Sequence, residues 1–303
     1  MTSTPVAWTT GLPPRRRDPA RILRRIGLYA VLIVGGLIMM VPFFWMIATS
    51  FKLRAEVSST GLLEFPTGLH IENFGRMWSA LPGVTFGDFF FNSLKIATLA
   101  TVGALVSCSL GAFAFAVLSF RGKGLLFALV MATLIIPFQV VLVPNFVLYR
   151  TLRHPFSDSG NWVGTHEPLW VGAWLGGAFG IFLLRQYFLT VPSELADAAR
   201  VDGANPWRIY RHIYLPLARP VLATLGIFTF MWTWNDFLWP LITIYSPNNM
   251  TIQLGLATFQ GAHQTNTNLL MAANVMSMIP ILLLFFFAQR YFIRGIATTG
   301  LKG

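Results

Sequence analysis

The chain has 303 residues, of which 55% are hydrophobic and 11% are charged, with a mean hydropathy of +0.62. Soluble domains carry about 25% charged residues, so the composition excludes an ordinary soluble protein and indicates an integral membrane protein. The net charge of +11 would indicate nucleic-acid binding only if the basic residues formed a common surface, and their positions along the chain decide that question.

Uncharged stretches predict the membrane-spanning helices. Four are long enough to cross a bilayer, for which about 20 apolar residues suffice: residues 26–51, 96–120, 124–149 and 264–289. Two further spans are expected at 168–184, which ends at Arg185, and at 217–245, which contains Arg219 and Asp236. An arginine at a helix end can extend to the membrane surface. The predicted fold class is therefore all-α integral membrane, with six transmembrane helices.

The basic residues lie mainly on one side of these six spans. That side holds residues 1–25, the 121–123 turn, the connection after residue 184 and the carboxyl end. The opposite side holds Lys52, Arg54, Arg76, Arg150 and Arg153, while Lys95 borders the second span. Because short cytoplasmic loops are rich in Lys and Arg, both termini are expected in the cytoplasm. The positive charge then reflects topology, and no nucleic-acid partner is expected.

This topology divides the chain into a basic cytoplasmic tail (residues 1–25), a transmembrane domain (residues 26–293) and a cytoplasmic carboxyl-terminal tail (residues 294–303). The first apolar stretch is too long for a signal-peptide core, so we expect it to remain as an anchor. The outer loops are too short for a sizeable separate domain. Cys108 lies inside the second span and cannot form an internal disulfide, because it is the only cysteine.

The cytoplasmic connection of residues 190–216, here called the 190–216 loop, has a local pattern of its own. A helix is predicted to begin at Pro192-Ser193 and to end at Asp202-Gly203. Asn205 then caps a second short helix, which has a proline at its first position and breaks at Leu215-Pro216. The loop is therefore predicted to be a helix, a turn and a helix on the cytoplasmic surface.

The spacing within this loop resembles the EAA motif of binding-protein-dependent ABC importer permeases. The match is Asp197-Ala198-Ala199, three residues, Gly203, nine residues, Ile213, one residue, and Leu215-Pro216. Asp197 stands where that family usually has Glu, which keeps the charge and shortens the reach.

Further stretches extend the resemblance over residues 26–303: "FGIFLLRQYFLTVPSEL", "WNDFLWPLI", "LLMAANVMSMIP" and the tail "RGIATTGLKG". Together they resemble the MalG-like subunit of carbohydrate importers of the CUT1 type. The tail matches more loosely, because Thr299 stands where the family often has Gly. The resemblance implies a type I ABC importer permease fold in which the EAA loop forms coupling helices that dock in a groove of the ATPase subunit.

The resemblance assigns ATPase coupling to residues of the 190–216 loop, namely Glu194, Asp197, Ala198, Ala199, Asp202, Gly203, Ile213, Leu215 and Pro216. The alternative is that the acids and arginines only stabilise short helices at the membrane surface. Gly300, Lys302 and Gly303 resemble a terminus that reaches toward the ATPase dimer in MalG-like subunits. An ordinary frayed end would account equally for that tail.

The chain lacks the sequence needed to hydrolyse ATP itself. A Walker A loop needs Gly-Lys followed by Ser or Thr, whereas the four lysines are followed by Leu53, Ile96, Gly124 and Gly303. We therefore expect no cofactor in this chain, with ATP and magnesium bound by a partner. The resemblance implies a cytoplasmic ABC ATPase dimer, a second, MalF-like permease and an extracytoplasmic solute-binding protein, in the cell membrane of a prokaryote.

Polar residues within the spans are candidates for the solute pathway. They are Gln139 and Asn145 in the third span, Asn235 and Asp236 in the fifth, and Asn274 in the sixth. Polar groups in a membrane either line a pathway or join helices to one another, and the sequence leaves both readings open. The histidines of the outer loops lack metal-ligand spacing, so no metal site is expected.

The predicted function is a permease subunit of an ATP-driven importer for a sugar or oligosaccharide. An importer for another small solute, such as glycerol phosphate or a polyamine, is the first alternative. A secondary transporter that works alone would show inverted repeats and intramembrane charges, of which only Asp236 is present. A membrane enzyme would need a nucleophile with a base and an orienting group, and the sequence shows no such set.

Overall fold

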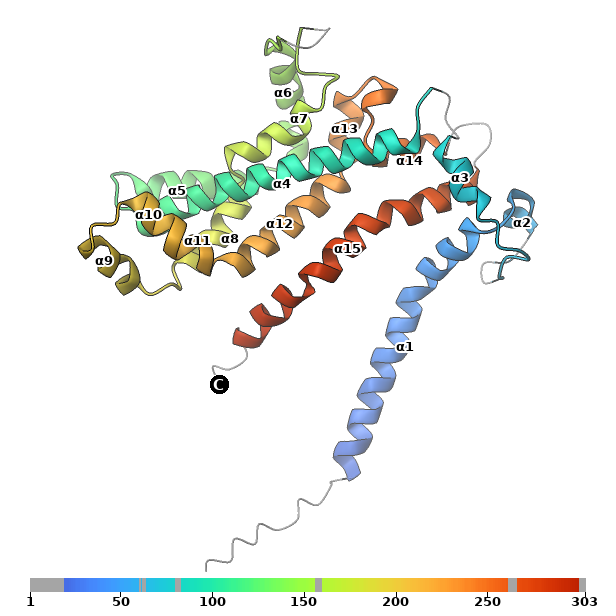
Figure 1. Cartoon of the computed structure of the whole chain (residues 1–303), viewed down its shortest axis with the longest axis horizontal. Helices are drawn as coiled ribbons and strands as arrows, with labels where there is room; N and C mark the ends of the chain where they lie inside the picture. Colours follow the sequence, from blue (N-terminus) through green and yellow to red (C-terminus); the bar gives the residue numbers. More distant parts are fainter. Residues whose placement is uncertain are drawn as a thin grey trace, which may run out of the picture.

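The computed structural model describes residues 19–59, 61, 64–79, 83–155, 160–260 and 266–299, and it places their side chains except at 19–22, 58, 288 and 290–299. These residues form helices joined by turns and short irregular connections, with one isolated β bridge between Arg153 and Asn161. The all-α prediction is confirmed for this part of the chain. Figure 1 shows α4 (Phe86–Val117) along the length of a helical bundle, from which α1 (Pro19–Ser50) diverges.

Four segments of the described chain are long and apolar enough to span a membrane: Leu23–Ser50, Phe86–Val117, Glu167–Phe188 and Thr267–Phe287. Two bent pairs, Lys123–Ile135 with Phe138–Thr151 and Pro206–Leu217 with Arg219–Trp234, raise the number to six if each pair is one span. Each predicted span overlaps one of these segments or pairs. Most boundaries differ from the predicted ones by a few residues, and the second, third and fifth spans differ further, in length or by a break.

The second span begins ten residues before its predicted start at Ile96 because a capping box opens α4 at Thr85. Thr85 Oγ1 accepts the Asp88 N–H at 3.3 Å, and Asp88 Oδ2 accepts the Thr85 N–H at 2.8 Å. These two bonds satisfy amide groups that a helix start leaves unpaired. The helix consequently runs past Lys95, the charge that had set the predicted start.

The third span is bent by 102°. α5 (Lys123–Ala132) continues into the short turn η1 (Thr133–Ile135), and α6 (Phe138–Thr151) begins after Pro137. Proline lacks an N–H and disfavours the helical conformation in the residue before it, and Ile136 is extended, with ψ at 114°. Pro137 therefore interrupts the third span, whereas α6 continues through Pro144.

The fifth span is broken as well, and Asp236 lies in the break. α12 (Arg219–Trp234) ends two residues before Asp236, and α13 (Leu238–Thr243) begins two residues after it. The span predicted at 217–245 is therefore divided at Asp236, with helix up to Trp234 and again from Leu238. Asp236 Oδ1 accepts the N–H of Trp239 at 3.3 Å, which satisfies a free amide in the first turn of α13.

α4 packs against α8 (Ala178–Phe188) and α12, and glycines allow the close approach. A Cβ on Gly103 would lie 2.3 Å from Trp174 Cδ1, and a Cβ on Gly180 would lie 2.7 Å from Cys108 Sγ. Both distances are far shorter than van der Waals contact. Trp174 instead lies flat enough on α4 to donate from Nε1 to the Leu99 carbonyl at 3.0 Å. Such small-residue contacts are how helices associate where lipid removes the hydrophobic driving force.

Two cations close the carboxyl end of α4. Lys123 Nζ donates to the Leu118 carbonyl at 2.8 Å, and Arg185 Nε donates to the Phe115 carbonyl at 3.1 Å. The Arg185 guanidinium also lies over the Phe127 ring, 4.2 Å from its centre. The last carbonyls of a helix lack partners within it and carry partial negative charge. These two side chains therefore join α4, α5 and α8 at one point.

A buried polar cluster joins three helices at the other end of α4. The Asn73 cluster consists of Ser50, Lys52, Asn73 and Asn268, all buried. Asn73 Nδ2 donates to the carbonyls of Ser50 and Lys52, each at 2.9 Å, and Asn268 Nδ2 donates to Asn73 Oδ1 at 3.2 Å. The cluster thus ties the end of α1 to α3 (Glu72–Trp78) and α15 (Thr267–Thr299).

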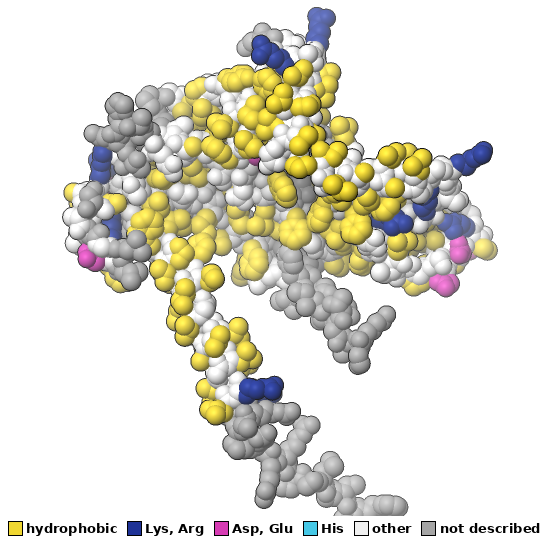
Figure 2. Space-filling view, turned by 180° about the vertical axis from the view of Figure 1, so that it is seen from behind, with side chains coloured by type: hydrophobic (Ala, Val, Ile, Leu, Met, Phe, Trp, Pro, Cys, Tyr) yellow, Lys and Arg dark blue, Asp and Glu magenta, His cyan; other side chains and the backbone are white. Residues whose placement is uncertain are grey.

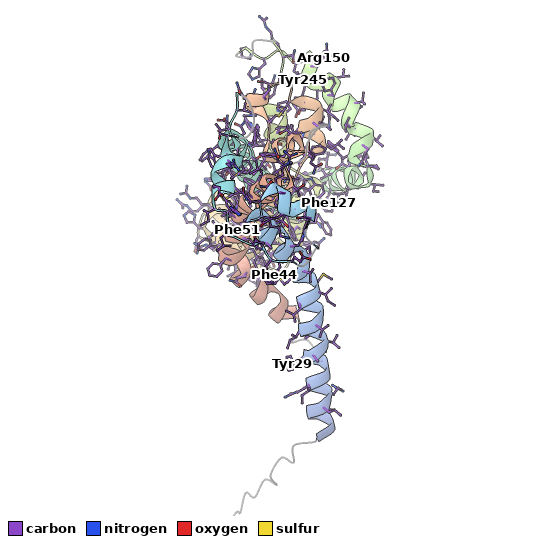
Figure 3. All side chains as sticks on the ribbon, turned by 90° about the vertical axis from the view of Figure 1, so that its right-hand side faces the viewer. Tyr29, Phe44, Phe51, Phe127, Arg150 and Tyr245 are labelled. Carbon is purple, nitrogen blue, oxygen red and sulfur yellow. The ribbon has the colours of Figure 1, made fainter. Side chains whose placement is uncertain are left out.

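Apolar side chains cover much of the described surface. Figure 2 shows hydrophobic side chains over the helices and basic side chains gathered toward the ends of the molecule. α1 is exposed over most of its length: no residue of its most apolar stretch is buried. Figure 3 shows Tyr29 on the length of α1 that stands apart from the bundle and Phe44 nearer the bundle. An apolar surface of this extent is expected of a chain whose solvent is lipid.

Replacing Asn73 by alanine tests the role of the Asn73 cluster. Asn73→Ala removes two donated bonds and leaves the buried Ser50 carbonyl without this partner. Loss of such a partner costs about 1–3 kcal/mol. We expect a clear fall in the thermal unfolding midpoint of the detergent-solubilised protein. Asn248→Ala, at an exposed position, is the matched control, and an equal midpoint in the two variants would contradict this role.

Candidate functional site

The 190–216 loop folds as a helix, a turn and a helix at one end of the bundle (Figure 1). α9 (Ser193–Val201) is followed by Gly203, whose φ of +75° lies in the left-handed region. Asn205 Oδ1 then accepts the Arg208 N–H at 2.8 Å and caps α10 (Pro206–Ile209). The predicted helix, turn and cap are confirmed. Gly203 is needed for the turn because residues with a Cβ rarely adopt this conformation.

The charged residues of α9 face outward. Glu194, Asp197 and Asp202 are exposed, and Asp197 pairs with Arg200 one turn later. An exposed pair of this kind contributes little to stability. The acids therefore remain available at the surface of the loop.

Large apolar side chains of the loop are also exposed. Val201 is 88% exposed, and Leu195 and Trp207 are exposed as well, whereas Ala196 on the other face of α9 is fully buried. A groove of about 290 Å³ runs between α9 and the following turns; it is lined by Ala199, Asp202, Ala204, Arg208, Ile209, His212 and Ile213. Exposed apolar groups beside a groove mark an interaction surface. Ala198 is exposed and Ala199 half-buried, so both small side chains leave room beside α9.

The inner side of the loop is held by aromatic packing. Residues Tyr210–Tyr214 form a π-helical turn, which continues into α11 (Leu215–Leu217). The ring centre of Phe113 on α4 lies 5.3 Å from that of Tyr210 and 5.4 Å from that of Tyr214. The ring centre of Phe188 on α8 lies 5.3 Å from that of Tyr214. Ile213 and Leu215 pack on the same cluster. The loop is thus fixed to two helices of the bundle.

The predicted break at Leu215-Pro216 is wrong by two residues. Pro216 lies within α11, and the chain turns at Ala218 before α12, with a bend of 78°. Pro216 has no N–H to donate back to the preceding turn. The π-helical turn ends at Tyr214, directly before α11, and the Leu215 N–H donates to the Tyr210 carbonyl five residues earlier.

A cavity of about 630 Å³ opens between α8 and α12. It is lined by Phe179, Leu225, Phe228, Thr229, Met231, Trp232, Thr233 and Asn235. None of these side chains is charged. Trp232 is 81% exposed, and the two threonines and Asn235 supply polar atoms. Asn235 Nδ2 donates to the Met231 carbonyl at 2.8 Å. Asn235 directly follows α12, so its side chain lies where this span breaks.

The structure does not gather the five predicted pathway residues at one place. Asn235 lines the cavity, and Asp236 follows it but bonds to α13. Asn274 Nδ2 donates to the Leu270 carbonyl of its own helix at 2.9 Å. Gln139 is exposed and Asn145 half-buried on α6. Asp236, Asn274 and Asn235 thus all bond to nearby backbone, and the pathway assignment of the five residues stays a prediction.

Three further residues of interest escaped the sequence analysis: Ser109, Tyr210 and Trp232. Ser109 Oγ and Tyr210 OH lie 2.8 Å apart and are buried, although 101 residues separate them in the chain. Only the packing of α4 on the loop brings them together. Trp232 is one of several tryptophans in its span, and its exposure beside the cavity is what distinguishes it. Gly300, Lys302 and Gly303 lie outside the described residues.

The described part of the chain holds no group of three or more His, Cys, Asp or Glu side chains in a metal-binding arrangement. The geometry instead offers a surface and a cavity. The surface can bind another protein, and the cavity can hold an uncharged solute.

Comparisons with known proteins give matches both in sequence and in structure. A sequence profile of the family described as "Binding-protein-dependent transport system inner membrane component" matches residues 103–298. The arabinooligosaccharides transport system permease protein AraQ of Halalkalibacterium halodurans is 35% identical over 264 residues, which is 86% of this chain and 91% of AraQ. The sn-glycerol-3-phosphate transport system permease protein UgpE of Salmonella choleraesuis is 34% identical, over 88% of this chain and 94% of UgpE.

A solved structure supports the fold. A chain from the crystal structure of a bacterial ABC transporter involved in the import of the acidic polysaccharide alginate aligns with a TM-score of 0.76 and 22% identity, over 92% of this chain and all of that chain. At this identity the likeness shows a shared fold. Together with the profile match over most of the chain, it leads to one conclusion. The chain belongs to the family of inner membrane components of binding-protein-dependent transport systems, the permeases of ABC importers.

Proposed function

We propose that this chain is the transmembrane permease subunit of an ATP-driven importer for a sugar or oligosaccharide and forms half of the solute pathway. The observation that carries this proposal is the helix–turn–helix of the 190–216 loop, which presents uncovered apolar side chains at one end of a membrane-spanning bundle. An ordinary connector between two spans would not expose Val201, Leu195 and Trp207 together.

The proposed topology has six spans and both termini in the cytoplasm. Counting each bent pair as one span gives the six crossings. An even number of crossings places both chain termini on the same side of the membrane. The side that holds the 190–216 loop carries the excess of Lys and Arg and is therefore cytoplasmic. The chain is then a multi-pass protein of a prokaryotic cell membrane. The loop consequently faces the compartment that holds ATP.

The 190–216 loop is the proposed docking surface for the ATPase. Glu194, Asp197 and Asp202 offer charge for orientation, and the small Ala198 and Ala199 allow close approach. The inner side of the loop holds the docking surface against the bundle. It includes Ile213 and Leu215, which pack on the aromatic cluster, and Pro216, which lies in α11. ATP and magnesium are bound by the partner. The full assembly contains an ABC ATPase pair, a second permease and an extracytoplasmic solute-binding protein.

An uncharged sugar suits the cavity between α8 and α12. A sugar ring has apolar faces that lie against aromatic rings, and its hydroxyls need hydrogen-bond partners such as Thr229, Thr233 and Asn235. Relatives named for arabinooligosaccharides and lactose support this choice. UgpE is named for sn-glycerol-3-phosphate, and a phosphate would require Arg or Lys. The cavity lining has neither, which disfavours that alternative.

The mechanism follows from the connection between loop and cavity. The ATPases would move the 190–216 loop when they close on ATP, and α4, α8 and α12 would carry the motion to the cavity as rigid bodies. The solute would thereby gain access to one side of the membrane at a time. α8 and α12 pack directly on α4, and Phe113 of α4 contacts Tyr210 and Tyr214 of the loop.

The turn at Gly203 provides a direct test of coupling. Gly203→Ala meets no atom within 4 Å, so its effect comes from forcing a Cβ into a φ of +75°, which costs about 1–2 kcal/mol. We expect uptake in cells to fall about tenfold while the protein inserts normally. Gly203→Asn should retain more uptake than Gly203→Ala, because Asn tolerates this conformation better.

Gly122→Ala is the matched control, since Gly122 has a φ of +78° and equally open surroundings in a different turn. It should leave uptake close to that of the wild type. Equal losses in the two alanine variants would mean that general strain, and not coupling, causes the defect.

The protein should not transport by itself. Reconstituted alone in lipid vesicles, the chain lacks both its energy source and half of the pathway, so no accumulation of labelled sugar is expected. Addition of the ATPase, the second permease and the binding protein should establish ATP-dependent uptake. Transport by the chain alone, downhill or uphill, would contradict the assignment.

Trp232 should matter for the solute. Trp232→Ala removes the largest exposed ring of the cavity lining, and we expect about a tenfold loss of sugar uptake by the complete transporter. Trp232→Phe should keep a ring surface and most of the uptake. Phe286→Ala, an exposed ring on α15 away from the cavity lining, is the control. Unchanged uptake by Trp232→Ala would exclude this face as a solute contact.

A further inference from the structure

The π-helical turn of the 190–216 loop contains a buried polar contact with the centre of the bundle. Ser109 on α4 is 1% exposed and Tyr210 is 5% exposed. Their side-chain oxygens are 2.8 Å apart, and Ser109 Oγ also lies 3.1 Å from the Val106 carbonyl. Both hydroxyls are therefore satisfied, as buried polar groups must be.

A hydrogen bond at this place adds direction to the packing. The rings of Phe113 and Tyr210 already hold the loop against α4, and apolar contacts of this kind can slide with little change in energy. A hydrogen bond weakens steeply with distance and angle, so the Ser109–Tyr210 pair fixes the position of Tyr210 along α4. Alanine and phenylalanine would fill the same space without that restraint.

The backbone at Tyr210 is also unusual. Tyr210 begins the five-residue π-helical turn Tyr210–Tyr214. π turns occur mainly as single-turn insertions in helices and are frequent at functional sites. A backbone of this kind can change its hydrogen-bond register over a short distance. This turn lies between the exposed part of the loop and α12, where such a change in register would shift the two relative to each other.

α4 leads from this contact to the cavity. Cys108, next to Ser109, packs so tightly on Gly180 of α8 that a Cβ on Gly180 would come within 2.7 Å of its sulfur and 3.1 Å of Leu225 Cδ1. Gly180 adjoins Phe179, and both Phe179 and Leu225 line the cavity. A displacement of α4 at Ser109 is thus transmitted to two cavity residues through direct contacts.

We propose that the Ser109–Tyr210 pair is the positioning contact that couples movement of the 190–216 loop to α4 and the cavity. This assignment rests on the proposed function, in which an ATPase moves the loop. Ser109 and Tyr210 are positioning residues, because they act on the cavity through α4. The pair keeps loop and helix in a fixed register, so that motion of one becomes motion of the other.

The test uses the complete transporter with its ATPase, second permease and binding protein in vesicles. Tyr210→Phe and Ser109→Ala each remove the same hydrogen bond and keep the ring or the small size of the side chain. We expect each variant to lower the ratio of sugar-stimulated to basal ATP hydrolysis about fivefold, as loss of one such bond would give. Co-purification of the ATPase should match the wild type, because the docking surface is unchanged.

The double variant distinguishes a shared bond from two separate defects. Because both substitutions remove one interaction, Ser109→Ala with Tyr210→Phe should be no worse than either alone. Tyr214→Phe is the matched control. Its ring packs on the same Phe113 but its hydroxyl takes no part in the Ser109–Tyr210 contact, so the stimulation ratio should stay at the wild-type value.

Several results would overturn the proposal. One is a wild-type stimulation ratio in Tyr210→Phe, and another is additive losses in the double variant. A third is a loss confined to thermal stability or to ATPase co-purification, because the pair would then have a structural role only. Failure of the wild-type chain to bind any ATPase would overturn the proposed function as well. That result would be seen before any variant is compared.

Discussion

Backbone hydrogen bonding in an apolar solvent is the constraint on which this structure depends. Lipid offers no partner for a free N–H or C=O, so each crossing must be helical and each break must be satisfied from within the protein. The breaks of this chain meet that requirement in particular ways. Arg185 and Lys123 bond the carbonyls at the end of α4, and Asp236 accepts an amide of α13.

The same constraint determines where function can lie. Within a continuous helix every backbone group is hydrogen-bonded and the helix behaves as a rigid unit. A break whose backbone groups are bonded by other parts of the protein places polar groups in the membrane and allows a change of local geometry. Both proposed functional regions adjoin such breaks. The cavity ends at Asn235, where α12 stops, and the 190–216 loop joins the bundle through the π-helical turn at Tyr210–Tyr214. Between them, α4 is unbroken from Phe86 to Val117 and is suited to transmit movement.

Local signals in the sequence predicted much of this arrangement. Apolar stretches located the spans, and Asp202-Gly203 and Asn205 located the turn and cap of the loop, because those effects depend on neighbouring residues. The capping box at Thr85 was missed since a charge within a helix, Lys95, had been taken as its boundary. The Ser109–Tyr210 contact and the exposed face of Trp232 could not be predicted, because they arise only when distant helices pack together.

The Asn73 cluster has a consequence for how the protein is made. Asn268 donates to the carbonyl of Lys52, which lies 216 positions earlier in the sequence, so this bond cannot form until the ribosome has synthesised most of the polypeptide. Until then Asn73 can bond the carbonyls of Ser50 and Lys52 without Asn268. The junction at the end of α1 is therefore completed late in biogenesis, and a prematurely terminated product would lack the two bonds that Asn268 donates.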